Sequence, residues 1–281
     1  MITSEFLAIF YGLTSAASWG TGDFSGGLAT KRSNVYTVVI ISQLAGMVTL
    51  IGLAFWLAEP FSTWSDLQLG AAAGIAGVIG LVALYRGLAV SPMGVVAPLA
   101  AVVTGVMPVV VGLIIEGLPT LFQLIGFALA LVAVWLISRG NGEVNFRPRD
   151  LGLPVVAGIG FGLFFIFIDR VSAGAVLWPL VAARVASITL LLVFVIATRQ
   201  VQIPAAGQLP LMILAGIFDT GGNAFFTLAA QLGRLDISAV LSSLYPATTV
   251  ILAWVILKER LRLTQWFGVA LALLAVVLIA L

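Results

Sequence analysis

Two charged residues, Arg184 and Asp219, lie inside apolar runs that are long enough to cross a membrane. A charge in the hydrocarbon core costs roughly 3 kcal/mol or more unless it is paired. Arg184 lies about 8 residues (~12 Å) from one end of its run, and Asp219 about 11 residues (~17 Å) from the opposite end of its run. These depths nearly coincide in a core of ~30 Å, so we predict a buried pair or a shared water-filled cavity. The pair either holds the carboxylate and ammonium groups of a ligand, with Asp219 able to take a proton, or is purely structural.

Other polar and aromatic side chains recur at helical spacing on the apolar runs. Asp219, Asn223 and Thr227 follow one another at intervals of four, and Ser242 and Tyr245 share a face with Pro246 beside them as a hinge or kink. The candidate substrate-binding residues are Trp19, Tyr85, Phe165, Arg184, Asp219, Asn223, Thr227, Ser242 and Tyr245. The alternative for these positions is helix packing, since Ser and Thr hydroxyls also bind neighbouring helices.

A second set of residues is a candidate for gating or for coupling to H⁺. Asp23 and Asp169 occupy equivalent positions near the ends of two runs, which is typical of helix caps, gate contacts or interface residues. Asp219 and Pro246 complete the set, as a buried acid and a bend in the chain.

The composition excludes several classes of chemistry. The chain has no Cys and no His, so it lacks thiolate and imidazole metal ligands and the Ser-His nucleophile pair. It has no phosphate-binding G-x-x-x-x-G-K-[ST] sequence, and its net charge of +2 does not favour nucleic acid. We therefore expect no catalytic residues, no metal, no cofactor and no enzyme activity.

The elements that position these residues are membrane-spanning helices. Of 281 residues 62% are hydrophobic and 9% charged, which is typical of a protein that lies in the lipid bilayer. Runs of about 20 apolar residues predict ten transmembrane helices. Their ranges are 5–29, 35–57, 66–90, 94–115, 120–138, 151–171, 176–198, 208–232, 236–257 and 263–281.

The two halves of the chain repeat one another. Gln123–Ile137 and Gln265–Ile279 are identical at 10 of 15 positions. We assign a first five-helix repeat to residues 1–140, a cytoplasmic linker to 141–150 and a second repeat to 151–281. Because five is odd, the second half enters the bilayer inverted, as in many secondary transporters with a midplane site. The fold class is therefore an all-α membrane protein with two inverted repeats around a central cavity, in which Gln43 is the neutral counterpart of Arg184.

The basic residues predict the orientation. Ten of the 13 Lys and Arg residues fall in the loops on one side, which by the positive-inside rule is the cytoplasm. These ten are Lys31, Arg32, Arg86, Arg139, Arg147, Arg149, Arg199, Lys258, Arg260 and Arg262. Both termini are then expected on the outer, periplasmic side.

Several short motifs resemble one family. Trp19-Gly20 late in the first helix is followed by Lys31, and Leu257–Leu261 (LKERL) by Gln265 and Gly268. The first half has the same arrangement of Glu, Gln and Gly at Glu116, Gln123 and Gly126. A further motif is Arg86–Ala89 (RGLA), which precedes Ser91-Pro92. In this order the motifs resemble the drug/metabolite transporter superfamily, ten-helix EamA type, and most closely its bacterial amino-acid exporters, including those for aromatic amino acids. The resemblance implies a cavity lined by helices 1–4 and 6–9, with helices 5 and 10 at the periphery.

The resulting expectation is a secondary transporter that exports neutral and aromatic amino acids across the bacterial inner membrane by alternating access, with H⁺ coupling an open question. Its partners are then the substrate and the lipid bilayer, as a monomer or a homodimer. The alternative is an exporter of other small metabolites or drugs. Two further alternatives are remote. A channel usually shows rings of like charge or a filter built by several subunits, and neither is visible in the sequence. An intramembrane aspartyl protease is suggested by Gly20–Asp23 (GTGD), but the duplication has no role in its mechanism.

Overall fold

The computed structural model describes residues 4–90, 93–137, 152–200, 202, 204, 206–258 and 262–279, and this part of the chain is all-helical, without a β-strand. Its α-helices are α1 (Ser4–Thr30), α2 (Val35–Trp56), α3 (Trp64–Val90), α4 (Met93–Ile115), α5 (Leu121–Ile137), α6 (Gly152–Asp169), α7 (Leu177–Ala197), α8 (Leu209–Leu232), α9 (Leu235–Ser242), α10 (Tyr245–Ile256) and α11 (Leu263–Ile279). A 3₁₀ turn, η2 (Ala206–Gln208), precedes α8. The predicted linker 141–150 lies outside the described residues.

The helices follow the predicted spans to within two residues at their ends, with one difference. The ninth predicted span, 236–257, is two helices, α9 and α10, separated by Ser243 and Leu244. Pro246 lies in the first turn of α10, where its missing N–H costs nothing, whereas inside a continuous helix it would leave a carbonyl unbonded. The predicted bend beside Pro246 is therefore confirmed as a break in the helix.

Much of this helical structure is suited to lipid. Among the described residues, six spans are long and apolar enough to cross a membrane: Val35–Trp56, Trp64–Gly87, Gly152–Asp169, Leu177–Ala197, Leu209–Leu232 and Leu235–Ile256. Apolar helices of 10–17 residues cover Ala100–Ile115, Leu121–Ile137 and Leu263–Ile279. Large apolar side chains such as Val48, Ile114 and Leu273 point outward, as expected of a surface that faces hydrocarbon.

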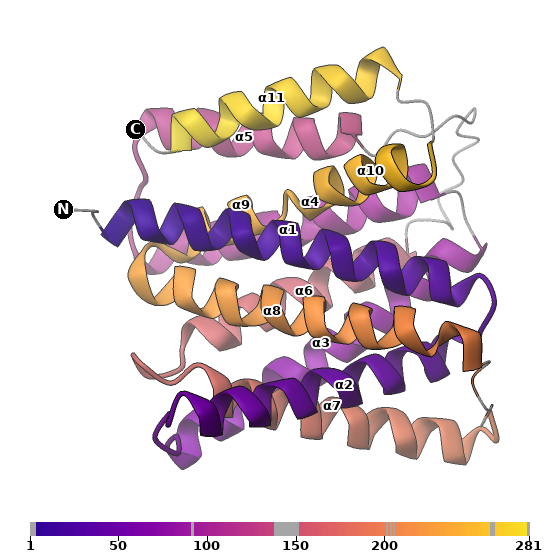
Figure 1. Ribbon diagram of the computed structural model, residues 1–281. Helices are drawn as coiled ribbons and strands as arrows, with labels where there is room; N and C mark the ends of the chain where they lie inside the picture. Colours follow the sequence, from indigo (N-terminus) through magenta and orange to yellow (C-terminus); the bar gives the residue numbers. More distant parts are fainter. Residues whose placement is uncertain are drawn as a thin grey trace.

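Helices of one half pack mainly against helices of the other (Figure 1). α1 packs along α8, and α3 along α6, while α2 contacts α7 and α8, and α3 contacts α7. Two glycines permit this close approach: a Cβ at Gly74 would overlap the carbonyl of Ala183, and one at Gly216 that of Ser42. The start of α1 and the end of α11 lie at the same end of the molecule.

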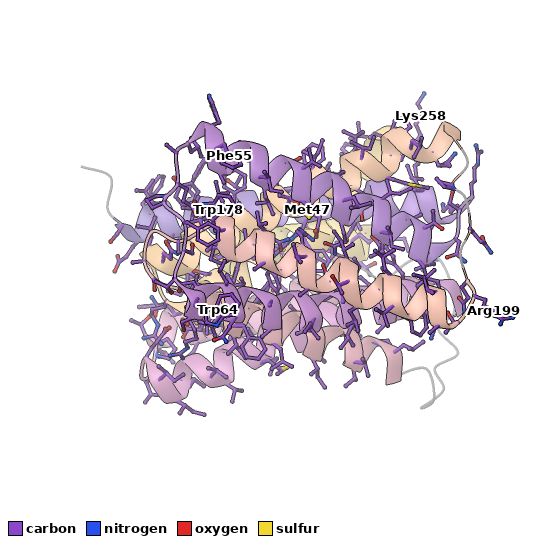
Figure 2. All side chains as sticks on the ribbon, turned by 90° about the horizontal axis from the view of Figure 1, so that it is seen from below. Met47, Phe55, Trp64, Trp178, Arg199 and Lys258 are labelled. Carbon is purple, nitrogen blue, oxygen red and sulfur yellow. The ribbon has the colours of Figure 1, made fainter. Side chains whose placement is uncertain are left out.

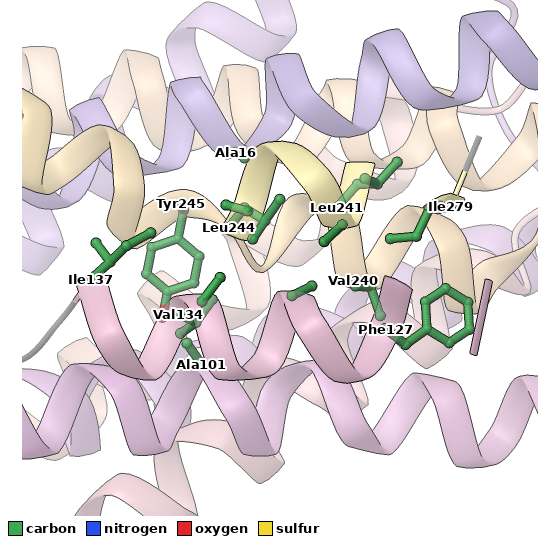
Figure 3. Packing of buried hydrophobic residues seen from close by; sticks show 14 residues of the cluster. Ala16, Ala101, Phe127, Val134, Ile137, Val240, Leu241, Leu244, Tyr245 and Ile279 are labelled. Carbon is green, nitrogen blue, oxygen red and sulfur yellow. The ribbon is translucent and has the colours of Figure 1, made fainter. Parts of the chain in front are cut away.

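α5 and α11 pair with each other at one edge of the molecule (Figure 1). Their interface is apolar, with Phe127 and Val134 of α5 in the same buried cluster as Ile279 of α11. Figure 3 shows this cluster continuing to Leu241 and Tyr245, so that the pair is anchored on α9 and the start of α10.

The two ends of the helix bundle differ in chemistry (Figure 2). Arg199 and Lys258 lie at one end, and Phe55, Trp64 and Trp178 lie at the opposite end. Tryptophan is enriched where a membrane protein meets the lipid headgroups. Helix α1 also begins at this end of the bundle.

Candidate functional site

A cavity lies between the two halves of the chain. Its lining comes from α1, α2, α3, α4, α6, α7, α8 and α10, and no lining residue belongs to α5 or α11. Its polar and charged residues are Asp23, Gln43, Thr104, Arg184, Ser187, Asp219 and Asn223. Its aromatic residues are Trp19, Phe161, Phe164, Phe165 and Tyr245. The lining therefore agrees with the expectation that the fifth helix and the last helix are peripheral.

The predicted pairing of Arg184 with Asp219 is confirmed. Arg184 Nη2 donates to Asp219 Oδ2 at 2.6 Å and to Thr220 Oγ1 at 3.2 Å. Arg184 Nη1 donates to the amide oxygen of Gln43, its predicted counterpart in the first half. Only 7% of the Arg184 side chain is exposed, against 35% of the Asp219 side chain. The guanidinium is thus neutralised and buried, while the carboxylate still borders the cavity.

Asp23 lies within α1, which ends at Thr30 as predicted to within one residue. Its side chain is half-buried and lines the cavity. Within the described part of the chain it forms no hydrogen bond or ion pair, and it is close enough to Asp219 for the two carboxylates to interact. It is therefore a cavity residue and not a helix cap.

Aromatic rings form one wall of the cavity. Trp19 of α1 stacks on Phe165 of α6, with ring centroids 5.3 Å apart, and Phe165 stacks on Phe226 of α8 at 4.2 Å. Trp19 and Phe165 are predicted pocket residues, and both line the cavity. Phe226 is fully buried and does not belong to the lining, so it supports Phe165 from within the helix packing.

The two tyrosines among the candidates have different surroundings. Tyr245 lines the cavity, and its hydroxyl is buried with no hydrogen-bond partner in the described residues. Tyr85 is buried outside the lining, with its hydroxyl against Gly26 of α1.

Three candidate substrate-binding residues with hydroxyl or amide side chains donate hydrogen bonds to other groups of the protein. Asn223 lines the cavity, and its Nδ2 donates to Asp219 Oδ2 at 3.4 Å. Thr227 Oγ1 donates to the Asn223 carbonyl at 2.8 Å, and Ser242 Oγ to the Gly12 carbonyl at 3.3 Å. Thr227 and Ser242 are fully buried and do not belong to the lining, so the structure places them in helix packing.

Arg234, in the second half of the chain, contacts residues of the first half at the end of the bundle that carries Phe55, Trp64 and Trp178. It contacts Asp236 at 2.8 Å and Glu116 at 3.6 Å, and it donates to the Gly117 carbonyl at 2.8 Å. The hydrogen bond to Asp236 raises the pKa of Arg234 above its ordinary value. Asp169, the last residue of α6, pairs with Arg170 at 3.6 Å at this helix end and does not line the cavity.

Glu59 makes a second connection at the same end. Its carboxylate accepts hydrogen bonds from the backbone N–H groups of Val176, Leu177 and Trp178, which open α7. An acidic group at this position compensates the positive end of the helix dipole. In the sequence Glu59 is only a charge between two apolar runs, and nothing in its spacing indicates a contact with α7.

The comparisons with known proteins identify the family. The sequence matches the EamA-like transporter family over residues 6–139 and 151–281. The chain belongs to the EamA-like transporter family. Membership, together with the apolar helices, makes it a multi-pass integral membrane protein and indicates a membrane transporter.

Two individual matches accompany the family assignment. An uncharacterized protein of Methanocaldococcus jannaschii is 29% identical to this EamA-like chain over 130 residues, which is 46% of this chain and 93% of that protein. A crystal structure described only as that of a protein has a TM-score of 0.79 at 16% identity, covering 100% of this chain and 99% of the other. The second match shows that the fold is known among solved structures.

Proposed function

We propose that this EamA-like protein is a secondary transporter that exports neutral and aromatic amino acids across the bacterial cytoplasmic membrane by alternating access. The supporting observation is the cavity between the halves, which is lined both by the stacked rings of Trp19 and Phe165 and by the Arg184–Asp219 pair. An aromatic amino acid combines a ring with charged groups, and this cavity offers complementary surfaces to both.

Inverted five-helix repeats form part of this proposal. The family match leaves out 140–150, which includes the predicted linker, and the archaeal relative is about as long as one half of the chain. In the proposed repeats α1 corresponds to α6, and α3 corresponds to α8. The packing of α1 against α8 is then equivalent to the packing of α6 against α3, and both are observed. Two halves of opposite orientation supply the two states that alternating access requires.

The proposed orientation places the basic end of the bundle in the cytoplasm and both termini outside. Lys258 and Arg199 at one end, opposite Trp64 and Trp178, support it. The outer end then carries the contacts of Arg234 with Glu116 and of Glu59 with α7. Export requires these contacts to separate, with the break beside Pro246 as one hinge.

Counterflow in proteoliposomes tests the proposal. Vesicles loaded with unlabelled phenylalanine should accumulate labelled phenylalanine transiently and saturably, and alanine and leucine loads should also support exchange. An imposed H⁺ gradient that changes the rate would indicate coupled transport. Linear, non-saturable flux would instead identify a channel.

A second candidate is the export of other small metabolites or drugs. It is favoured by the engagement of Arg184 with Gln43, Asp219 and Thr220, because this removes the cation that would bind an amino-acid carboxylate. Absence of exchange with every amino acid, together with saturable flux of an amine or drug, would select this candidate.

A further inference from the structure

The charges that line the cavity do not cancel. Arg184 is the one Arg or Lys among the described lining residues, and Asp23 and Asp219 are the two carboxylates. The hydrogen bonds of Arg184 to Gln43, Asp219 and Thr220 occupy its two terminal nitrogens. With both acids ionised, the cavity carries one negative charge more than its protein groups compensate.

When both acids are ionised, Asp23 is the carboxylate without a compensating partner. It forms no ion pair or hydrogen bond within the described ranges, whereas Asp219 has both Arg184 and Asn223 as partners. The neighbouring carboxylate of Asp219 repels it, and an isolated charge at this depth is unfavourable. A cation that enters the cavity relieves both penalties.

The surroundings of Asp23 suit an ammonium group that is attached to an aromatic body. Trp19 precedes Asp23 by four residues on α1, so both lie on one face of the helix. The indole and Phe165 stack at 5.3 Å, and such rings attract a nearby cation. Tyr245 is 8% exposed and lines the same cavity, and its ring adds to the aromatic surface there.

We propose that Asp23 binds the ammonium group of the transported molecule, with the second oxygen of Asp219 as an additional acceptor. The substrate class is then aromatic and apolar amines, including amino acids that are recognised by their ammonium end and not by their carboxylate. This assignment rests on the proposed function only in taking the cavity as the transport site.

Three matched probes test the assignment on the purified full-length protein in lipid nanodiscs. Phenylalanine has both charged groups, phenethylamine has only the ammonium, and 3-phenylpropionate has only the carboxylate. Equilibrium binding of the radiolabelled probes should give dissociation constants within about tenfold of each other for the first two, and at least about 100-fold weaker binding of the third, as expected for charge-assisted hydrogen bonds.

Variants at Asp23 locate the site. Asp23→Asn should weaken both amine probes by about 10- to 100-fold, while Asp23→Glu, which keeps the charge, should lose less than about tenfold. Glu5→Gln, an exposed acid on the same helix, removes the same charge far from the cavity and should bind like the unmodified protein. The thermal midpoint of each variant reports whether it is folded.

Several results would overturn the assignment: equal binding of 3-phenylpropionate, no binding of any probe, or a folded Asp23→Asn protein that binds amines normally. Counterflow separates this inference from the proposed function. Amine binding that requires Asp23 but is never followed by exchange retains the site and rejects amino-acid export. Unchanged phenylalanine counterflow in Asp23→Asn retains export and rejects the site.

Discussion

Replacing Arg184 by methionine is the perturbation whose effect follows most directly from the structure. Methionine keeps a long, flexible apolar side chain in the space of the arginine stem but removes the guanidinium. Asp219 then loses its ion pair at 2.6 Å, and Gln43 and Thr220 lose a hydrogen-bond donor. The carboxylate of Asp219 is left beside Asp23, with Asn223 as its remaining side-chain partner in the described part of the protein.

The size of the effect depends on how deeply the two charges are buried. Breaking a buried ion pair by removing one partner costs about 3–5 kcal/mol. The Asp219 side chain is 35% exposed, toward the cavity, so the lower end of about 3 kcal/mol applies. At roughly 2–4 °C per kcal/mol, the thermal midpoint of Arg184→Met should fall by about 6–12 °C.

A double-mutant cycle in one detergent, followed by differential scanning fluorimetry, measures the pair itself. Asp219→Asn alone leaves the arginine buried without a counter-charge, while the double variant removes both charges and should recover roughly 1–3 kcal/mol relative to additivity. Lys31→Met, an exposed cation at the helix end, is the matched control and should change little. A midpoint for Arg184→Met equal to that of the unmodified protein, or additive effects of the two changes, would refute the reasoning.

Three further predictions concern packing, a helix end and the aromatic wall. Gly216→Ala should lose about 1–3 kcal/mol of stability because its Cβ overlaps the Ser42 carbonyl, whereas Gly52→Ala, with nothing within 4 Å, should be neutral or slightly stabilising in the same thermal assay. Glu59→Gln should lower the thermal midpoint by the equivalent of about 1–2 kcal/mol, because it removes a charge from the start of α7; a midpoint that does not move would show that the contact is dispensable. Trp19→Leu should weaken equilibrium binding of phenylalanine by about 2- to 10-fold and should weaken leucine binding less, because Trp19 supplies an aromatic surface of the cavity. An equal loss for both amino acids would show that the ring does not stack on the substrate.

The helices were predictable because their signal is local. Apolar runs of membrane length fix each span from its own residues, and the helix ends agree with the structure to within two residues. The pairing of Arg184 with Asp219 was also predictable, since two isolated charges at equal depth have few other ways to be neutralised. Pro246 indicated a break near this position, but the sequence did not show that the break falls at Ser243 and Leu244.

Other parts of the site depend on contacts between distant segments, which spacing within one helix does not reveal. Thr227 and Ser242 have the pattern of cavity residues, but they donate to the carbonyls of Asn223 and Gly12 and are buried in helix packing. The contact of Arg234 with Glu116 joins two loops that are 118 residues apart. The sequence places Asp23 near the end of its predicted span, but it does not show that other helices enclose Asp23 in the cavity.

Counterflow with a blocked cavity tests most directly whether this cavity is the transport site of an amino-acid carrier. Leu81 of α3 lines the cavity and is only partly buried, so Leu81→Trp adds a bulky ring to the space between the halves. We expect saturable phenylalanine exchange in proteoliposomes of the unmodified protein and of the Glu5→Gln control, and at least about tenfold slower exchange in a folded Leu81→Trp protein. Undiminished exchange in Leu81→Trp, or flux that does not saturate in the unmodified protein, would contradict the account.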